Sequence, residues 1–368
     1  MIRFESIHYL GGKARVLPHI NEILTESLFE HSTDFQTVLD GFSGSTQVSQ
    51  FFKSCGKVVT ANDLAPHSRV LGECFLLAQR PHNEYKTVID YLNNLTPTDG
   101  WFTATYGGND NQGSSVQHDG LKRPFQVHVT RKLDAIRDEI EHLYPQDCID
   151  KSVLLTALLL ALDPLVNGLG HQVSYLRTWS KASYRPLVLS VPRYTPDALQ
   201  HRVFSQDAFS LSRKPYDLCY FDPPYGTGNL VTLGTRVRYF SYYHLWTTVV
   251  KHDKPAVVGA ARRREDVSRD SNPGAISVFE HLRMDVVEQA FVDLLTKFDT
   301  RFTLLSYSNR GKVTIARLLE IAASYQRICK TLSFVYKENG QAGAITHGKL
   351  KAAYDAPNTE YLILLERQ

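Results

Sequence analysis

Four consecutive residues in the second half of the chain combine a carboxylate, two prolines and an aromatic ring. Asp222, Pro223, Pro224 and Tyr225 directly follow the apolar run "YDLCYF". A residue before proline favours extended conformations and proline has no N–H, so the segment is stiff and presents hydrogen-bond acceptors. Such a set suits a planar base, whose amino group donates two N–H bonds and whose ring stacks on Tyr225. The alternative is a proline-rich turn with Tyr225 packed on the surface.

Acids and glycines also follow three other strand-like runs. Asp40, Gly41 and Gly44 come after "FQTVL", Asp63 after "KVVTAN" and Asp207 after "HRVFSQ". Ligands of an open parallel sheet bind outside the carboxyl ends of its strands, where glycine lets backbone come close and an acid accepts bonds from ribose hydroxyls. The pattern predicts a nucleoside cofactor. The lack of GxGxxG and GxxxxGK[ST] argues against a dinucleotide or a triphosphate.

The elements that would position these residues are short apolar strands alternating with helices. Unalternating runs of this kind predict an α/β fold with a mostly parallel sheet covered on both faces. Further strands are expected at Arg301–Asn309, Thr331–Lys337 and Glu360–Arg367, and the last two could pair antiparallel at the end of the sheet.

The βα rhythm is interrupted between about Leu76 and Leu199. We therefore expect two parts: residues 1–75 and 200–368 form one domain, and residues 76–199 an inserted one with approximate boundaries.

Bulk properties restrict the class of protein. The 368 residues carry a net charge of only +3, so nucleic-acid affinity would depend on local basic patches. The apolar run Val153–Leu162 is too short to span a bilayer and predicts a core helix. The first residues lack the apolar segment of a secretory signal, and the five cysteines show no CxxC spacing. We expect a cytoplasmic protein with reduced thiols, no metal site and no membrane association.

Asp-Pro-Pro-Tyr after a hydrophobic strand resembles the signature of N(6)-adenine-specific DNA methyltransferases. Four other segments are similar to motifs of that family: Tyr9–Ile20, Leu39–Asp63, Gly168–Trp179 and Arg238–Val249. Cofactor motifs first and Asp-Pro-Pro-Tyr last is the order of the Dam-like alpha group, whose members occur in restriction-modification systems. The resemblance implies a Rossmann-like methyltransferase sheet with an inserted target-recognition domain. One departure is Thr46, which replaces the last glycine of the family's Phe-x-Gly-x-Gly turn.

The resemblance also implies roles. The Asp222 carboxylate and the Pro223 carbonyl would accept the two N–H groups of adenine, which is flipped out of duplex DNA, while Tyr225 stacks on its ring. S-adenosyl-L-methionine would be the methyl donor. The expected cofactor-binding residues are Tyr9, Gly12, Lys13, Asp40, Gly41, Phe42, Ser43, Gly44, Asp63 and Asp207. For Lys13, a solvated lysine at a helix start is the alternative.

Basic residues beside aromatic ones are the expected DNA contacts: Arg177, Lys181, Arg185, Arg236 and Arg238. The aromatic neighbours could equally belong to the core. We expect a monomer that acts on double-stranded DNA, with a separately encoded restriction endonuclease as a potential partner.

Three alternatives remain open. An RNA adenine methyltransferase would use the same tetrapeptide. A nucleic-acid-binding module that has lost catalysis is disfavoured by the intact Asp222, Gly44 and Asp63. N4-cytosine methylation is disfavoured because that chemistry usually goes with serine in place of the aspartate.

Overall fold

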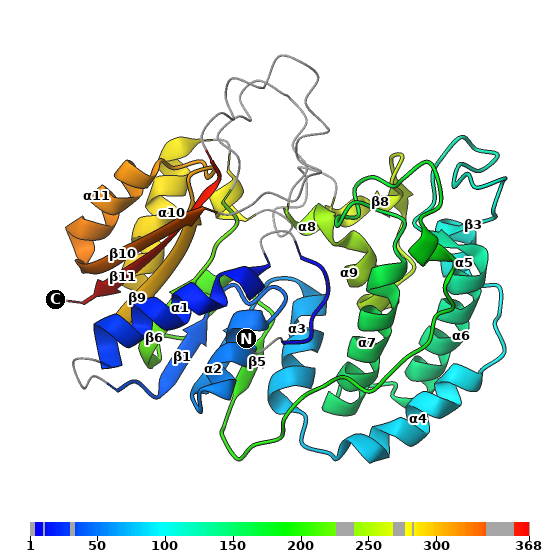
Figure 1. Ribbon diagram of the computed structural model, residues 1–368, viewed down its shortest axis with the longest axis horizontal. Helices are drawn as coiled ribbons and strands as arrows, with labels where there is room; N and C mark the ends of the chain where they lie inside the picture. The colour runs from blue at the N-terminus through cyan, green and yellow to red at the C-terminus, as the bar shows by residue number, and fades with distance from the viewer. Residues whose placement is uncertain are drawn as a thin grey trace.

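The centre of the computed structural model is a seven-stranded sheet (Figure 1). The structure describes residues 4–9, 12–29, 34–225, 239–267, 277–281, 283–335 and 357–367. The strands of the sheet are β1 (Thr37–Asp40), β2 (Val58–Asn62), β5 (Arg202–Phe204), β6 (Pro215–Phe221), β9 (Asp299–Ser308), β10 (Arg327–Val335) and β11 (Thr359–Glu366). Each corresponds to a strand predicted from the sequence, so the α/β prediction is confirmed.

The strand order is β10-β11-β9-β6-β1-β2-β5. From β5 to β9 every neighbouring pair is parallel, whereas β11 is antiparallel to both β9 and β10. The predicted antiparallel pairing of the last two strands is thus confirmed. The antiparallel strand itself lies one place in from the edge of the sheet. Because β11 runs in the opposite direction, its first residues lie on the side of the sheet where the parallel strands have their carboxyl ends.

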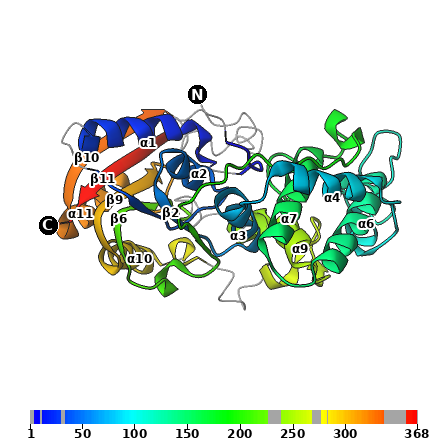
Figure 2. The same ribbon diagram turned by 90° about the horizontal axis from the view of Figure 1, so that it is seen from below.

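Successive residues of the central strands face opposite sides, as the period of two requires. Val38 and Leu304 belong to the core that packs on α1 (Leu17–Leu24) and α2 (Gln47–Ser54). Leu39 and Leu305 belong to the core that packs on α10 (Met284–Lys297) and α11 (Ile315–Tyr325). Figure 2 shows α1 and α2 on one side of the sheet and α10 on the other.

A helical part lies beside the sheet (Figures 1 and 2). Its helices are α3 (Pro66–Gly72), α4 (His82–Asn94), α5 (Trp101–Tyr106), α6 (Val127–Leu143), α7 (Ile149–Leu162), α8 (Tyr239–Tyr242) and α9 (His244–Lys251). Two short ribbons accompany them: β3 (Gly107–Gly108) with β4 (Phe125–Gln126), and β7 (Val257–Val258) with β8 (Arg263–Arg264).

One hydrophobic cluster holds this part together, and α7 is buried along most of its length. The core helix predicted from its apolar run is therefore confirmed. Because α3 and α9 contribute to the cluster from outside residues 76–199, the division into two domains stays a prediction. No helix in the part of the chain that the structure describes is both long and apolar enough to cross a membrane.

Candidate active site

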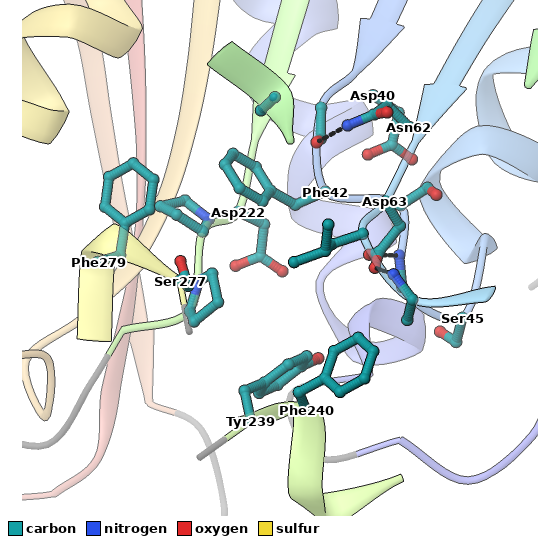
Figure 3. A pocket seen from close by; sticks show the side chains of 18 of the residues that line it. Asp40, Phe42, Ser45, Asn62, Asp63, Asp222, Tyr239, Phe240, Ser277 and Phe279 are labelled. Atoms are coloured by element: carbon teal, nitrogen blue, oxygen red, sulfur yellow. Dashed lines mark hydrogen bonds between the residues drawn. The ribbon is translucent and has the colours of Figure 1, made fainter. Parts of the chain in front are cut away.

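A cavity of about 430 Å³ lies where β1, β2, β5 and β6 end. Its lining contains every predicted catalytic residue and every predicted cofactor-binding residue: Tyr9, Gly12, Lys13, Asp40, Gly41, Phe42, Ser43, Gly44, Asp63, Asp207, Asp222, Pro223, Pro224 and Tyr225. Figure 3 shows the Asp222 carboxylate directed into the cavity, with Asp63 across from it and Tyr239 and Phe240 on another wall. The structure thus brings these residues together, as parallel strands bring their carboxyl ends together.

The turn after β1 depends on two missing side chains. A Cβ on Gly41 would lie 2.7 Å from Cδ1 of Phe221, and a Cβ on Gly44 would lie 2.8 Å from Cε1 of Tyr9. Gly44 also has φ +46°, a conformation that favours glycine. The sequence predicted that the missing Cβ atoms of these glycines make room for a ligand. The structure shows that they also make room for the rings of Phe221 and Tyr9, which pack against the turn.

Thr46 takes the left-handed backbone conformation, with φ 64°, in place of the glycine typical of this turn. That conformation is strained for a β-branched residue. The Thr46 side chain is fully buried, and its hydroxyl donates to the Ser45 carbonyl at 2.7 Å and accepts from Gln50 Nε2 at 3.2 Å. These two local hydrogen bonds stabilise a backbone conformation that glycine would adopt without strain.

Asp63 fastens the turn to the end of β2. Its Oδ2 accepts from the Gly44 N–H and its Oδ1 from the Ala65 N–H, each at 2.8 Å. Burial raises the pKa of this carboxyl, and the backbone bonds act against that rise. Sequence reasoning missed the preceding residue, Asn62, whose Nδ2 donates to the Gly41 carbonyl at 3.3 Å and the Gln206 carbonyl at 3.1 Å. Asn62 therefore ties together the ends of β1, β2 and β5.

The two other strand-end acids differ in environment. Asp40 is 1% exposed and accepts from Ser49 Oγ at 2.6 Å. Burial raises the pKa of Asp40 to about 7, even though the Ser49 hydrogen bond lowers it. Asp207 is exposed, and its Oδ1 accepts from the Phe209 N–H at 2.8 Å. That bond caps the short 3₁₀ turn Ala208–Ser210.

Lys13 connects the Asp-Pro-Pro-Tyr segment to the rest of the site. Its Nζ lies 3.0 Å from Asp222 Oδ1 and donates to the Tyr225 hydroxyl at 2.8 Å. The Lys13 side chain is only 7% exposed, so the interpretation as a solvated lysine is wrong. Burial raises the pKa of the Asp222 carboxyl, while the Lys13 charge lowers it.

An aromatic wall closes the side of the cavity nearest the helical part. The ring of Tyr9 stacks on Tyr243 at 4.1 Å between centroids, and Tyr239 meets it edge-on at 5.6 Å. His67, also in the wall, is buried, which lowers its pKa to about 3, and its Nδ1 lies 3.4 Å from Thr247 Oγ1. The sequence grouped Tyr239 and Tyr243 with the arginines expected to contact DNA, whereas both line the cavity together with Tyr9, which was predicted there.

The predicted DNA contacts that the structure describes lie outside the cavity lining. Arg177, Lys181 and Arg185 are exposed on the helical part. Of their aromatic neighbours, Tyr175 and Trp179 are buried core residues. Arg236 and Arg238 lie outside the described residues.

The polar groups of the cavity suit an organic ligand. Gln47 Oε1 and His67 Nε2 are buried there with no hydrogen-bond partner among the described residues. Across those same residues, no cluster of three or more His, Cys, Asp or Glu side chains could hold a metal ion. Unpartnered buried polar atoms normally indicate a missing partner, so a ligand with both donors and acceptors fits this cavity.

Comparison with known proteins agrees with this geometry. The sequence model of the D12 class N6 adenine-specific DNA methyltransferases matches residues 9–278. The Type II methyltransferase M.NlaIII of Neisseria lactamica is 26% identical over 322 residues, which cover 86% of this chain and 87% of that protein. The modification methylase LlaI of Lactococcus lactis subsp. lactis is 26% identical over 340 residues, 87% of this chain and 49% of that protein. The Type II methyltransferase M.FokI of Planomicrobium okeanokoites is 25% identical over 335 residues. The chain spans about half the length of the last two relatives, 49% and 47%.

Proposed function

The chain belongs to the D12 class N6 adenine-specific DNA methyltransferase family, and on that premise we propose that it transfers a methyl group from S-adenosyl-L-methionine to the N6 amino group of adenine in duplex DNA. The observation that carries the proposal is the shared cavity. It places the Asp222 carboxylate and the glycine turn after β1 around one space of about 430 Å³. That space suits a nucleoside-sized ligand and a base together.

The cofactor pocket is assigned to the turn after β1 and the strand ends. S-adenosyl-L-methionine supplies a methyl group on a sulfonium, and its amine, ribose hydroxyls and adenine amino group are hydrogen-bond donors. The cavity offers acceptors in the Asp40, Asp63 and Asp207 carboxylates and in Gln47 Oε1. Asp63 would hold the ribose hydroxyls and Asp207 the cofactor's adenine. Tyr9, Gly12 and Lys13 would line its methionine end.

Asp222 and Pro223 would activate the target amino group. The lone pair of an adenine amino nitrogen is delocalised into the ring, which makes it a poor nucleophile. When the Asp222 carboxylate and the Pro223 carbonyl each accept one N–H, the lone pair is directed toward the methyl donor. The rate then depends on positioning and electrostatics. Tyr225 would stack on the flipped base, worth about 1–3 kcal/mol in comparable base–aromatic contacts.

The DNA surface is assigned to the helical part. Arg177, Lys181 and Arg185 would contact phosphates, with Arg236 and Arg238 as further contacts. The named relatives are a modification methylase and two Type II methyltransferases. We therefore infer that this chain, acting as a monomer, protects DNA against a separately encoded restriction endonuclease.

The test is a methyl-transfer assay with purified protein. Labelled S-adenosyl-L-methionine is mixed with plasmid DNA, and nucleosides of the digested product are separated by mass spectrometry. We expect N6-methyladenine at one sequence, which sequencing of modified bases in DNA from expressing cells would identify.

Parallel reactions test the alternatives. Structured RNA replaces DNA in one, and N4-methylcytosine is monitored in the other. Methylation of RNA alone or of cytosine would overturn the proposal. So would DNA binding without consumption of the methyl donor, which is the behaviour of an inactive binding module.

A further inference from the structure

Glu360 is a second buried carboxylate at the active site. It is the second residue of β11, pairs in register with Ser308 of β9, and is 6% exposed. β11 runs antiparallel to its neighbours, so the start of this strand reaches the same edge as the ends of β1, β2 and β6. No sequence motif singled out this residue.

Glu360 contacts Lys13 and Tyr225, the two residues whose side chains also interact with the Asp222 carboxylate. Its Oε2 accepts from the Tyr225 hydroxyl at 3.1 Å and lies 3.8 Å from Lys13 Nζ. The Tyr225 hydroxyl also lies 3.2 Å from Ser306 Oγ. Lys13 Nζ therefore stands between two carboxylates, at 3.0 Å from Asp222 and 3.8 Å from Glu360, with the Tyr225 hydroxyl beside it.

The charges of this group do not cancel when both carboxylates are ionised. Burial raises the pKa of Glu360, Lys13 lowers it, and the nearby Asp222 charge raises it. Among the described residues, the other titratable groups facing the pair are Tyr225 and Tyr220, whose pKa values are raised by burial, and Asp40, which interacts with Asp222. Among the groups that the structure describes here, one ammonium shared by two ionised carboxylates leaves a net negative charge, which favours a cationic methyl donor.

We propose that Glu360 is a positioning residue that shares the Lys13 ammonium with Asp222, so that the Asp222 carboxylate stays a strong hydrogen-bond acceptor for the target amino group. This inference rests on the proposed function. Without Glu360, the ammonium no longer divides its charge between two carboxylates, and it weakens Asp222 as a hydrogen-bond acceptor. Glu360 also holds the Tyr225 hydroxyl and thereby fixes the ring assigned to the base.

The test is the pH profile of methyl transfer by Glu360→Gln, which retains an acceptor for Tyr225 but loses the charge. A Lys13 charge that is no longer shared with Glu360 and the loss of a neighbouring negative charge both lower the pKa of Asp222. The acidic limb of kcat/KM should therefore move about one unit to lower pH. The plateau rate should fall about tenfold, because Asp222 is a weaker acceptor.

Ser306→Ala is the matched control, since it removes a different partner of the Tyr225 hydroxyl without changing charge. Its acidic limb should stay where the wild type has it. Lys13→Met combined with Glu360→Gln should return the limb to higher pH and raise the plateau above that of Glu360→Gln. An acidic limb that Glu360→Gln leaves unmoved would overturn the inference.

A stability measurement separates this inference from the proposed function. Urea unfolding of Lys13→Met, Glu360→Gln and the double variant gives a coupling free energy that needs no activity. A measurable coupling in a protein that methylates nothing would defeat the proposed function alone. Normal methylation with no coupling would defeat the sharing of Lys13 alone.

Discussion

Among single residues, Asp222 carries the most specific chemical assignment. Its carboxylate faces the cavity, and Lys13 Nζ stands 3.0 Å from Oδ1. Asp222→Ala should lower single-turnover methyl transfer at least about a hundredfold, because it removes an acceptor that acts on the reacting nitrogen. Binding of S-adenosyl-L-methionine, measured by calorimetry, should persist, since Lys13 retains Tyr225 and Glu360 as partners. Retained transfer would refute the role of Asp222.

Asp40 provides a pH test at the same scale. Burial raises its pKa in the folded protein to about 7, above the ordinary value of 3.8. A carboxyl whose pKa is higher in the folded than in the unfolded protein stabilises the fold fully when the pH is below its unfolded-state pKa. That stabilisation is lost as the pH rises through its folded-state pKa. The stability of the wild type relative to Asp40→Asn should therefore decline between about pH 4 and pH 7, by up to about 1.4 kcal/mol per pH unit.

Urea unfolding of both proteins without cofactor, at several pH values, measures that decline. A difference that stays constant from pH 4 to pH 8 would contradict the burial argument for Asp40.

At the scale of elements, two glycines of positive φ flank α2 and offer a matched pair. Gly44, φ +46°, precedes the helix, and a Cβ there would lie 2.8 Å from the Tyr9 ring. Gly56, φ +72°, follows the helix, and a Cβ there would meet nothing within 4 Å. Gly56→Ala should cost about 1 kcal/mol of stability through backbone strain alone. Gly44→Ala should cost more and should also weaken cofactor binding, because Tyr9 must move.

Urea unfolding and cofactor titration of both variants measure the two effects. If the two substitutions lowered stability equally and left cofactor affinity unchanged, the packing of Tyr9 on the turn would not matter for binding.

The strands of the sheet were predictable because each is an apolar run that ends at an acid or a turn residue. Thr46 was recognised as a departure from glycine, but its compensating bond from Gln50 depends on the helix that follows. Asn62 and Glu360 could not be found this way. Their contacts join strand ends that are distant in sequence, and Glu360 reaches the site only because β11 is antiparallel.

At the scale of the whole molecule, the exposed arginines of the two parts should differ in function. Arg177 lies on the helical part, and Arg317 lies exposed on α11, on the far side of the sheet. If Arg177 neutralises one phosphate, Arg177→Ala should reduce the slope of log affinity against log salt concentration by about one. Arg317→Ala, which removes the same charge, should leave the slope unchanged.

Fluorescence anisotropy with a duplex oligonucleotide at several salt concentrations measures both slopes. Equal changes in the two variants would point to a general effect of net charge. The sequence left open whether the aromatic neighbours of these basic residues belong to the core, and the structure places Tyr175 and Trp179 there.

The position of β11 has a consequence for biosynthesis. A ribosome that has added Val335 has already supplied Lys13, Asp222, Tyr225 and every strand of the sheet except β11. At that point β9 and β10 still lack the strand that lies between them, and the second carboxylate beside Lys13 has not been made. The charge arrangement of the site is therefore finished only when the last strand leaves the ribosome, and a prematurely terminated chain lacks it.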